Sequence, residues 1–287
     1  MISGSVSEQS TDDAESGGRQ AQAALFAAIL AHDTIHPQAD LPAALHLDYD
    51  ADQLARCFHL SRRLWETPGD TRRLRAIVAT IIRTGRVAED QKTAFKHIRA
   101  RYKQLRFAYV IFDDRHRYPR ALDGVTKLMS HVQDALVLGR RRAVRGYAIA
   151  LRILLGGAFS AIVARELAGF RPTTARGFQE YVRRDIARGR EAVARGRMTG
   201  SQFHATRKII SRQAALYDCL RVLYPSAYHD RIARYISTIN GLMGAAHDDI
   251  VARTPPRSHG YETEQVEVPE RITVMLTAFA ALHRPPA

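Results

Sequence analysis

An apolar stripe with helical spacing runs through residues 95–112 and sets the strongest limit on what the chain can fold into. Its members follow one another at steps of three and four residues: Phe95, Ile98, Tyr102, Leu105, Tyr109 and Phe112. Because an α-helix completes a turn in about 3.6 residues, all of these side chains lie on one side of a helix. The stripe therefore predicts a long helix that buries one side in a core.

A second stripe on the same helix is cationic. It uses the same three-four-three spacing one position further on, and its members are Lys96, Arg99, Lys103 and Arg106. The next acid in the chain, Asp113, comes only after the stripe has ended. Like charges at these spacings repel one another by about 0.2–0.5 kcal/mol per pair. The row therefore predicts an anionic partner that lies along the edge of the buried face.

The charge balance of the whole chain agrees with that prediction. Among 287 residues, 43 Lys and Arg stand against 29 Asp and Glu, which gives a net charge of +14. Nucleic acid, polyphosphate, a phospholipid surface and a phosphorylated metabolite would all answer such an excess. Cys57 and Cys219 form neither a disulfide framework nor a Cys-based zinc site, which fits a reducing cytoplasm.

Helical periodicity continues through most of the chain, with no run of alternating β-branched residues. Helices are expected over residues 23–31, 54–66, 70–84, 89–112, 121–141, 140–155, 158–170, 178–197, 202–223, 229–251 and 272–283. The apolar stretch Ala148–Ala168 is interrupted by Arg152 and Arg165, so we expect a buried core helix and not a membrane span. The chain thus reads as all-α, an antiparallel helical bundle.

Residues 1–22 are rich in Ser, Gly and acids and lack the apolar core of a signal peptide, so they predict a disordered N-terminal tail. The globular domain is expected over residues 23–287. A weak internal repeat at an offset near 107 residues divides it into pseudo-repeats of roughly 50–155 and 158–253, followed by a C-terminal loop and helix over 254–287. The repeat predicts two basic rows that face a shared channel.

The second row is carried by His204, Arg207, Lys208 and Arg212. With these residues the chain resembles the conserved histidine α-helical domain (CHAD) family. Arg99, Lys103, Leu105, Arg106 and Phe107 match the family's first helical pattern, and the later Leu-Gln-Asp pattern is matched by Val132 to Leu136. Lys96 stands where the family has histidine, and His97 lies one residue away.

The resemblance implies two pseudo-symmetric four-helix units with a basic groove that binds inorganic polyphosphate, and association with polyphosphate granules in the cytoplasm. It implies a binding protein without catalytic residues, metal or cofactor. The predicted polyphosphate-binding residues are those of the two rows: Lys96, Arg99, Lys103, Arg106, His204, Arg207, Lys208 and Arg212.

Two alternatives remain open on the residues. Asp248 and Asp249, with Asp113 and Asp114 as a partner pair, are typical of a Mg²⁺-dependent helical enzyme acting on a diphosphate, of isoprenoid-synthase or phosphohydrolase type. The third carboxylate expected one turn after each pair is absent from the sequence. The Arg-rich segment 178–197 predicts a basic surface helix that would serve non-specific nucleic-acid binding, without aromatic residues placed to stack on bases.

Overall fold

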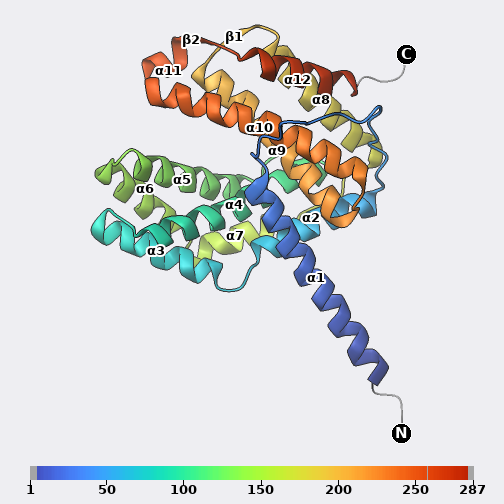
Figure 1. Ribbon diagram of the computed structural model, residues 1–287. Helices are drawn as coiled ribbons and strands as arrows, with labels where there is room; N and C mark the ends of the chain where they lie inside the picture. Colours follow the sequence, from blue (N-terminus) through green and yellow to red (C-terminus); the bar gives the residue numbers. More distant parts are fainter. Residues whose placement is uncertain (1–4, 257, 284–287) are drawn as a thin grey trace. The chain divides into compact units, whose positions relative to one another are not determined.

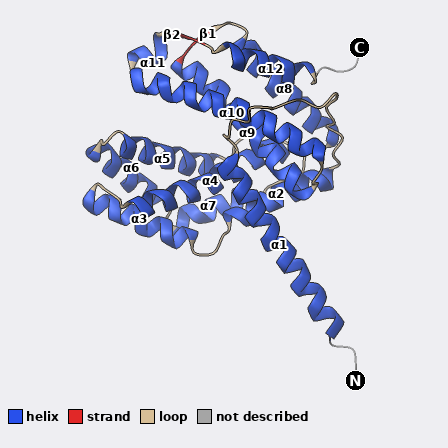
Figure 2. Cartoon of the chain, in the orientation of Figure 1, coloured by secondary structure: helices blue, strands red, loops and turns tan. Residues whose placement is uncertain are grey.

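The computed structural model describes residues 5–256 and 258–283, and over these ranges the chain is built almost entirely of α-helices (Figures 1 and 2). Short strands β1 (Arg197–Thr199) and β2 (Gln265–Glu267) pair antiparallel, with Met198 opposite Val266. The prediction of an all-α bundle is confirmed. The sheet is too small for its residues to show the alternation by which strands are recognised.

The chain forms two compact units. Unit 2 is the continuous stretch Leu54–Thr173, whereas unit 1 combines Met1–Gln53 with Thr174–Ala287. The division at residues 53 and 54 falls inside helix α2 (Ala51–Trp65). Of the predicted segments, residues 1–4, 257 and 284–287 lie outside the part that the structure describes.

Unit 2 contains a closed ring of four neighbouring helices. Helix α7 (Gly157–Ala168) packs beside the ring, and the Trp65 ring of α2 lies 5.7 Å from that of Tyr102. The ring helices are α3 (Asp70–Thr84), α4 (Glu89–Phe112), α5 (Arg120–Val137) and α6 (Arg141–Leu154), and α6 returns to pack on α3. Short connections make successive helices antiparallel. Figure 1 shows these helices side by side, from teal to green.

Local sequence explains where the helices of this ring end and begin. Gly85 ends α3 in the left-handed conformation with φ 68°, and Gly139 follows α5 with φ 64°. Glycine adopts this conformation without the steric cost that a side chain would bring. Glu89 and Asp90 occupy the first turn of α4, where the helix dipole favours acids. Local sequence therefore favours helix ends at these positions without help from long-range contacts.

The second half of α4 is buried on every side. Each residue from Gln104 to Phe112 is buried, including the aromatic residues Phe107, Tyr109 and Phe112. Elsewhere in unit 2, Phe58 and Phe170 stack with ring centroids 3.6 Å apart. The apolar stripe found in the sequence thus forms the centre of this unit, and the helix becomes fully enclosed beyond its midpoint.

Unit 1 contains a second closed ring, which is completed late in the chain. Its members are α8 (Ala175–Val193), α9 (Gly200–Leu223), α10 (Ala227–Arg253) and α12 (Glu270–Ala281), with the short helix α11 (His259–Thr263) between α10 and α12. Helix α12 packs on both α8 and α10. The fourth ring helix therefore lies in the segment that the sequence analysis placed after the repeats.

Helix α1 (Ser5–Ala31) and the loop after it are held to the helical ring of unit 1 by hydrogen bonds. Ser237 donates to the carbonyls of Ala31 and Thr34, and the Asn240 amide donates to the carbonyl of His32 at 2.9 Å. A Cβ on Gly241 would lie 2.2 Å from the carbonyl oxygen of Asp33. Only glycine allows the loop to cross α10 this closely.

The N-terminal segment differs from its prediction. The structure begins α1 at Ser5, so residues 5–22 are helical, whereas the sequence predicts a disordered tail up to residue 22. The contacts explain why composition failed to find this helix. Among residues 16–31 of α1, whose burial is described, the buried side chains are Leu25, Ala28 and Ile29. The sequence before them carries no apolar stripe that periodicity would detect.

The apolar stretch Ala148–Ala168 is also not the buried core helix that was expected. It breaks at Gly156 into α6 and α7, and Ile149, Ile153 and Ile162 are 50%, 68% and 50% exposed. In the described part of the chain no single helix has the length and apolar character to cross a bilayer. Helices α6 and α7 together meet that criterion by length and composition only, with a 66° bend between them.

Candidate functional site

Three of the four predicted cations on α4 form a continuous face in unit 2, which we call the α4 basic face: Lys96, Arg99 and Lys103. Lys96 is exposed. The guanidinium of Arg99 donates to the hydroxyl of Ser130 on α5, with nitrogen–oxygen distances of 3.2 and 3.0 Å. The Lys103 ammonium lies 5.4 Å from the centroid of the Phe107 ring. A hydroxyl and an aromatic ring thus help to orient the cationic groups of Arg99 and Lys103.

The fourth predicted cation, Arg106, has a different role. Arg106 is only 8% exposed, and its Nη1 donates to Asp123 on α5 at 2.8 Å. The guanidinium also lies 5.0 Å from the ring of Phe107 and 4.9 Å from that of Tyr118. Arg106 and Asp123 therefore form a largely buried structural ion pair. Arg106 does not extend the basic face, because its charge is already compensated.

The N-terminal end of the α4 basic face carries further positive charge. Burial lowers the pKa of His97, and the charges of Arg101 and Lys96 lower it further. Arg101 is paired with Asp70 at the start of α3, where Arg73 also contributes to the positive potential felt by His97. A histidine whose protonated form is disfavoured by surrounding cations indicates a locally positive site.

The α9 basic face in unit 1 consists of His204, Arg207 and Lys208. Thr199 caps the helix: its hydroxyl accepts from the Gln202 amide at 3.3 Å, and the Gln202 side chain accepts from the Thr199 amide at 2.9 Å. A Cβ on Gly244 of α10 would lie 3.1 Å from Nη2 of Arg207. Glycine at this position leaves room for the guanidinium to lie close to α10.

His247 of α10 belongs to this second face, although the sequence analysis did not select it as a binding residue. Its ring centroid lies 5.0 Å from that of His204, and its Nε2 lies 2.9 Å from the hydroxyl of Tyr261. Burial lowers the pKa of His247 to about 4, and Arg207 and Lys208 contribute to the shift. The imidazole is therefore neutral near neutral pH. An approaching anion would favour its protonation.

Arg212, the last predicted member of the second row, is a structural residue like Arg106. Its Nε and Nη2 donate to the two carboxylate oxygens of Asp185 on α8 at 3.0 and 2.6 Å. Asp185 is fully buried, and Arg188 lies 3.3 Å from the same carboxylate. Bidentate Arg–carboxylate pairing fixes α9 against α8. Arg212 is thus not part of the exposed cationic surface.

The aspartate pairs proposed for a metal-dependent enzyme are not assembled into a metal site. Burial would raise the pKa of Asp113, but the hydrogen bonds from Arg115 and from the Arg171 amide lower it overall. Asp113 is therefore an ionised anchor for Arg115. The Asp248 side chain is 82% exposed, and its carboxylate lies 4.0 Å from Nδ1 of His247. Within residues 5–256 and 258–283, no group of three or more His, Cys, Asp or Glu side chains is arranged to hold a metal ion.

The Arg-rich segment is more than the basic surface helix that was predicted. It forms α8, which ends at Val193 instead of continuing to residue 197, because Gly196 turns the chain with φ 70°. Phe178, Val182 and Ile186 are buried in unit 1. Arg176 pairs with Glu180 at 2.8 Å, and Asp185 compensates two further arginines. Of the arginines in these pairs only Arg188 belongs to segment 178–197, so the pairs account for a small part of the charge that favoured nucleic-acid binding.

Three functional or structural partners were missed by the sequence analysis: Asp123, Asp185 and His247. Asp123 and Asp185 lie on different helices from Arg106 and Arg212, and His247 lies on a different helix from His204, so no local spacing reveals these three contacts. Asp185 carries one signal, since it lies one residue before Ile186 and three after Val182, on the apolar side of α8. A lone acid among core positions usually needs a buried cation.

Comparison of the chain with protein-family models, curated proteins and solved structures finds no match.

Proposed function

We propose that the chain binds inorganic polyphosphate, or a linear polyanion of similar charge density, through the α4 basic face, with the α9 basic face as a second contact surface and without catalysis. The observation that carries the proposal is the uninterrupted positive run of α4. Six Lys and Arg residues and no acid lie between Asp90 and Asp113. Two of these cations, Arg101 and Arg106, meet carboxylates from neighbouring helices, Asp70 and Asp123.

The geometry of α4 suits a chain of phosphates. Residues three or four apart rise by about 5 Å along the helix axis, so successive cations present a regular charge spacing. Arg99 is oriented by Ser130, which limits the entropy lost when the guanidinium binds an anion. Because the contacts are electrostatic, affinity would fall steeply with salt. Association with cytoplasmic polyphosphate granules belongs to the same proposal.

The test is a titration with long-chain polyphosphate at two salt concentrations. Lys96→Gln/Lys103→Gln removes two charges from the α4 basic face without touching the buried Arg106–Asp123 pair. We expect the affinity to fall at least tenfold and the slope of log affinity against log salt to decrease by about one to two. Arg63→Gln/Arg72→Gln is the matched control, because both arginines are exposed in unit 2 and the net charge changes equally.

Equal losses in the two double variants would show that binding depends on net charge alone and would overturn the proposal. Duplex DNA bound as tightly as polyphosphate would favour the general nucleic-acid alternative. Incubation with Mg²⁺ and a diphosphate tests the enzyme alternative. Product formation that is lost in Asp248→Asn would replace the proposed function with a Mg²⁺-dependent enzyme.

A further inference from the structure

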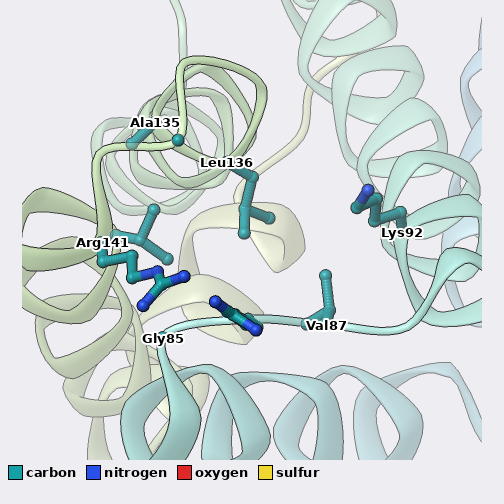
Figure 3. A pocket seen from close by; sticks show the side chains of 9 residues that line it. Gly85, Val87, Lys92, Ala135, Leu136 and Arg141 are labelled. Carbon is teal, nitrogen blue, oxygen red and sulfur yellow. The ribbon is translucent and has the colours of Figure 1, made fainter.

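A cavity of about 330 Å³ lies at one end of the unit 2 ring, between the α3–α4 turn and the α5–α6 turn. The residues that line it come from both turns and from the helices that begin there. Its walls include Arg86, Val87, Lys92, Leu136, Arg141 and Val144. Figure 3 shows Arg141 and Lys92 on opposite sides of the pocket, with Leu136 and Val87 directed into the space between them. The pocket is therefore both cationic and apolar.

The cationic side of the pocket is suited to a phosphate group. Arg86, Lys92 and Arg141 come from three separate segments, and among the described residues that line the cavity none is acidic. Lys92 pairs with Glu89 at 2.8 Å, but both side chains are largely exposed and such surface pairs are weak. Helices α4 and α6 also begin beside this pocket, and the positive ends of their dipoles favour an anion.

The turn that borders the pocket exposes apolar residues directly before a cluster of arginines. Val137 is 80% exposed and Leu138 is 41% exposed. Gly139, which also lines the cavity, is followed by three exposed arginines, Arg140, Arg141 and Arg142. The structure thus places two exposed apolar residues, Val137 and Leu138, next to three exposed arginines and the cationic pocket. Anionic bilayer surfaces are bound by this combination of apolar insertion and basic residues.

We infer that this end of unit 2 binds an anionic phospholipid, with the headgroup phosphate in the pocket and the Val137–Leu138 turn inserted among the acyl chains. Arg86 and Arg141 contact the phosphate, and the apolar wall of Leu136 and Val144 faces the glycerol and upper acyl region. A second copy of the chain is a poorer occupant, because it would bring Arg140, Arg141 and Arg142 against their own counterparts. This site is separate from the α4 basic face and does not depend on the proposed polyphosphate binding.

The experiment is co-sedimentation of the full chain with phosphatidylcholine vesicles that contain or lack phosphatidic acid, at physiological salt. We expect binding only to the vesicles that contain phosphatidic acid. Arg86→Gln/Arg141→Gln should weaken that binding about thirtyfold, since each basic residue at a membrane surface contributes about 1 kcal/mol. Val137→Ser/Leu138→Ser should weaken vesicle binding at least tenfold and leave polyphosphate affinity unchanged.

Two matched variants distinguish the pocket from general adsorption. Ile149→Ser/Ile153→Ser removes exposed apolar residues from α6 away from the turn, and Arg63→Gln/Arg72→Gln removes exposed charges elsewhere in unit 2. Both should bind the vesicles like the unmodified chain. Equal losses in the controls and in the site variants would overturn the inference.

The source of the phosphate is tested with glycerol phosphate as a soluble probe. Saturable binding of glycerol phosphate that needs Arg86 and Arg141, without any vesicle binding, would identify a soluble phosphate ester as the ligand and reject the membrane role. Self-association of the chain that is lost in Val137→Ser/Leu138→Ser, again without vesicle binding, would reassign the turn to an interface between copies. Circular dichroism of each variant verifies that the helices are retained.

Discussion

Helices α4 and α9 hold equivalent central positions in their units, but they are anchored by different chemistry. Both have 24 residues, and both are buried on nearly every side in their C-terminal halves. The buried half of α4 is rich in aromatic residues, with Gln104 and Arg106 as its polar members. That of α9 contains the polar residues Ser211, Gln213 and Asp218. The comparison shows that an enclosed central helix does not require a purely apolar sequence.

The same contrast appears in the ion pairs that fix the two helices. Arg106 of α4 shares the carboxylate of Asp123 with Lys127, and the Asp123 side chain remains 15% exposed. Arg212 of α9 binds Asp185, whose side chain is completely buried. Water and an alternative cation therefore remain available to Asp123, whereas Asp185 depends on its arginines. The anchor of α9 is expected to be the more costly one to break.

The largest expected effect is in Arg212→Met. Removal of one partner from a buried pair leaves an uncompensated charge and costs about 3–5 kcal/mol of unfolding free energy. Arg188 replaces only part of the lost contact, because its side chain is 58% exposed. Urea denaturation followed by circular dichroism measures the change. The double variant Arg212→Met/Asp185→Leu should recover most of the loss, and an equally unstable double variant would contradict this account.

The second effect concerns Asp218, which has no acidic counterpart in the buried half of α4. Burial raises its pKa from 3.8 to about 7. The folded state therefore holds a proton that the unfolded state releases, so this group makes stability fall as pH rises from about 4 to 7, by up to about 1.4 kcal/mol per pH unit. Asp218→Asn should be more stable than the unmodified chain at pH 7 by about 3 kcal/mol of unfolding free energy.

That prediction is tested by denaturation of both proteins across the pH range, with attention to their difference. The difference should shrink toward zero near the ordinary pKa of an aspartate. Parallel profiles for Asp218→Asn and the unmodified chain would mean that the carboxylate is ionised and compensated within the fold. In that case the polar interior of α9 would resemble the paired chemistry of Arg106 more closely than we infer.

A smaller effect is expected in Arg106→Met. Asp123 keeps its contact with Lys127 at 2.7 Å and its access to water, so the loss should be about 1–2 kcal/mol. The measurement is the same urea denaturation used for Arg212→Met. Equal losses of unfolding free energy in Arg106→Met and Arg212→Met would contradict the distinction between the partly hydrated Arg106–Asp123 pair and the fully buried Arg212–Asp185 pair.

The smallest expected effect is on the pH dependence of polyphosphate binding. We expect this dependence to be stronger for the α9 basic face than for the α4 basic face. The charged and titratable groups around His247 are Arg207, Lys208, His204, Tyr261 and Asp248. Burial, with a smaller contribution from the nearby cations, lowers the pKa of His247 to about 4, and a bound polyanion would move it back toward its ordinary value of 6.5. Binding therefore takes up protons and strengthens as pH falls.

We expect this contribution to increase affinity about three- to tenfold between pH 7 and pH 5. His247→Gln should remove this increase in polyphosphate affinity and leave the affinity at pH 7 unchanged. The same pH series on His97→Gln measures the corresponding contribution beside the α4 basic face. Isothermal titration in buffers of different ionisation enthalpy reports the proton uptake directly. A pH profile that is unchanged in His247→Gln would exclude the histidine as its source.

The sequence predicted the helices well because their burial is periodic. The stripe from Phe95 to Phe112 occupies one side of α4, and the limits of α9 and α10 agree with expectation to within two residues at each end. Prediction failed where tertiary contacts override composition. Ile149 and Ile153 look like core residues in the sequence, but the core side of α6 is formed by Val144, Ala148 and Leu151.

The candidate site was predicted only in part, for the same reason. Helical spacing finds which cations share a face, so Lys96, Arg99 and Lys103 were found together. It does not show which of them a carboxylate on another helix will neutralise, because Asp123 and Asp185 meet their arginines only in the folded chain. The role of the two faces in polyphosphate binding stays a prediction until the titrations are made.

The division of the chain into a continuous unit and a split one has a consequence for the order of folding. Unit 2 is complete once residue 173 has been synthesised, so its ring can close while the ribosome is still producing the remainder. The hydrogen bonds that join the end of α1 and the start of its loop to α10 form only after Ser237 and Asn240 have been made. The N-terminal segment must therefore wait through the synthesis of an entire helical ring before it is fastened. During that interval the buried residues of α1 remain open to chaperones or to pairing with another nascent chain.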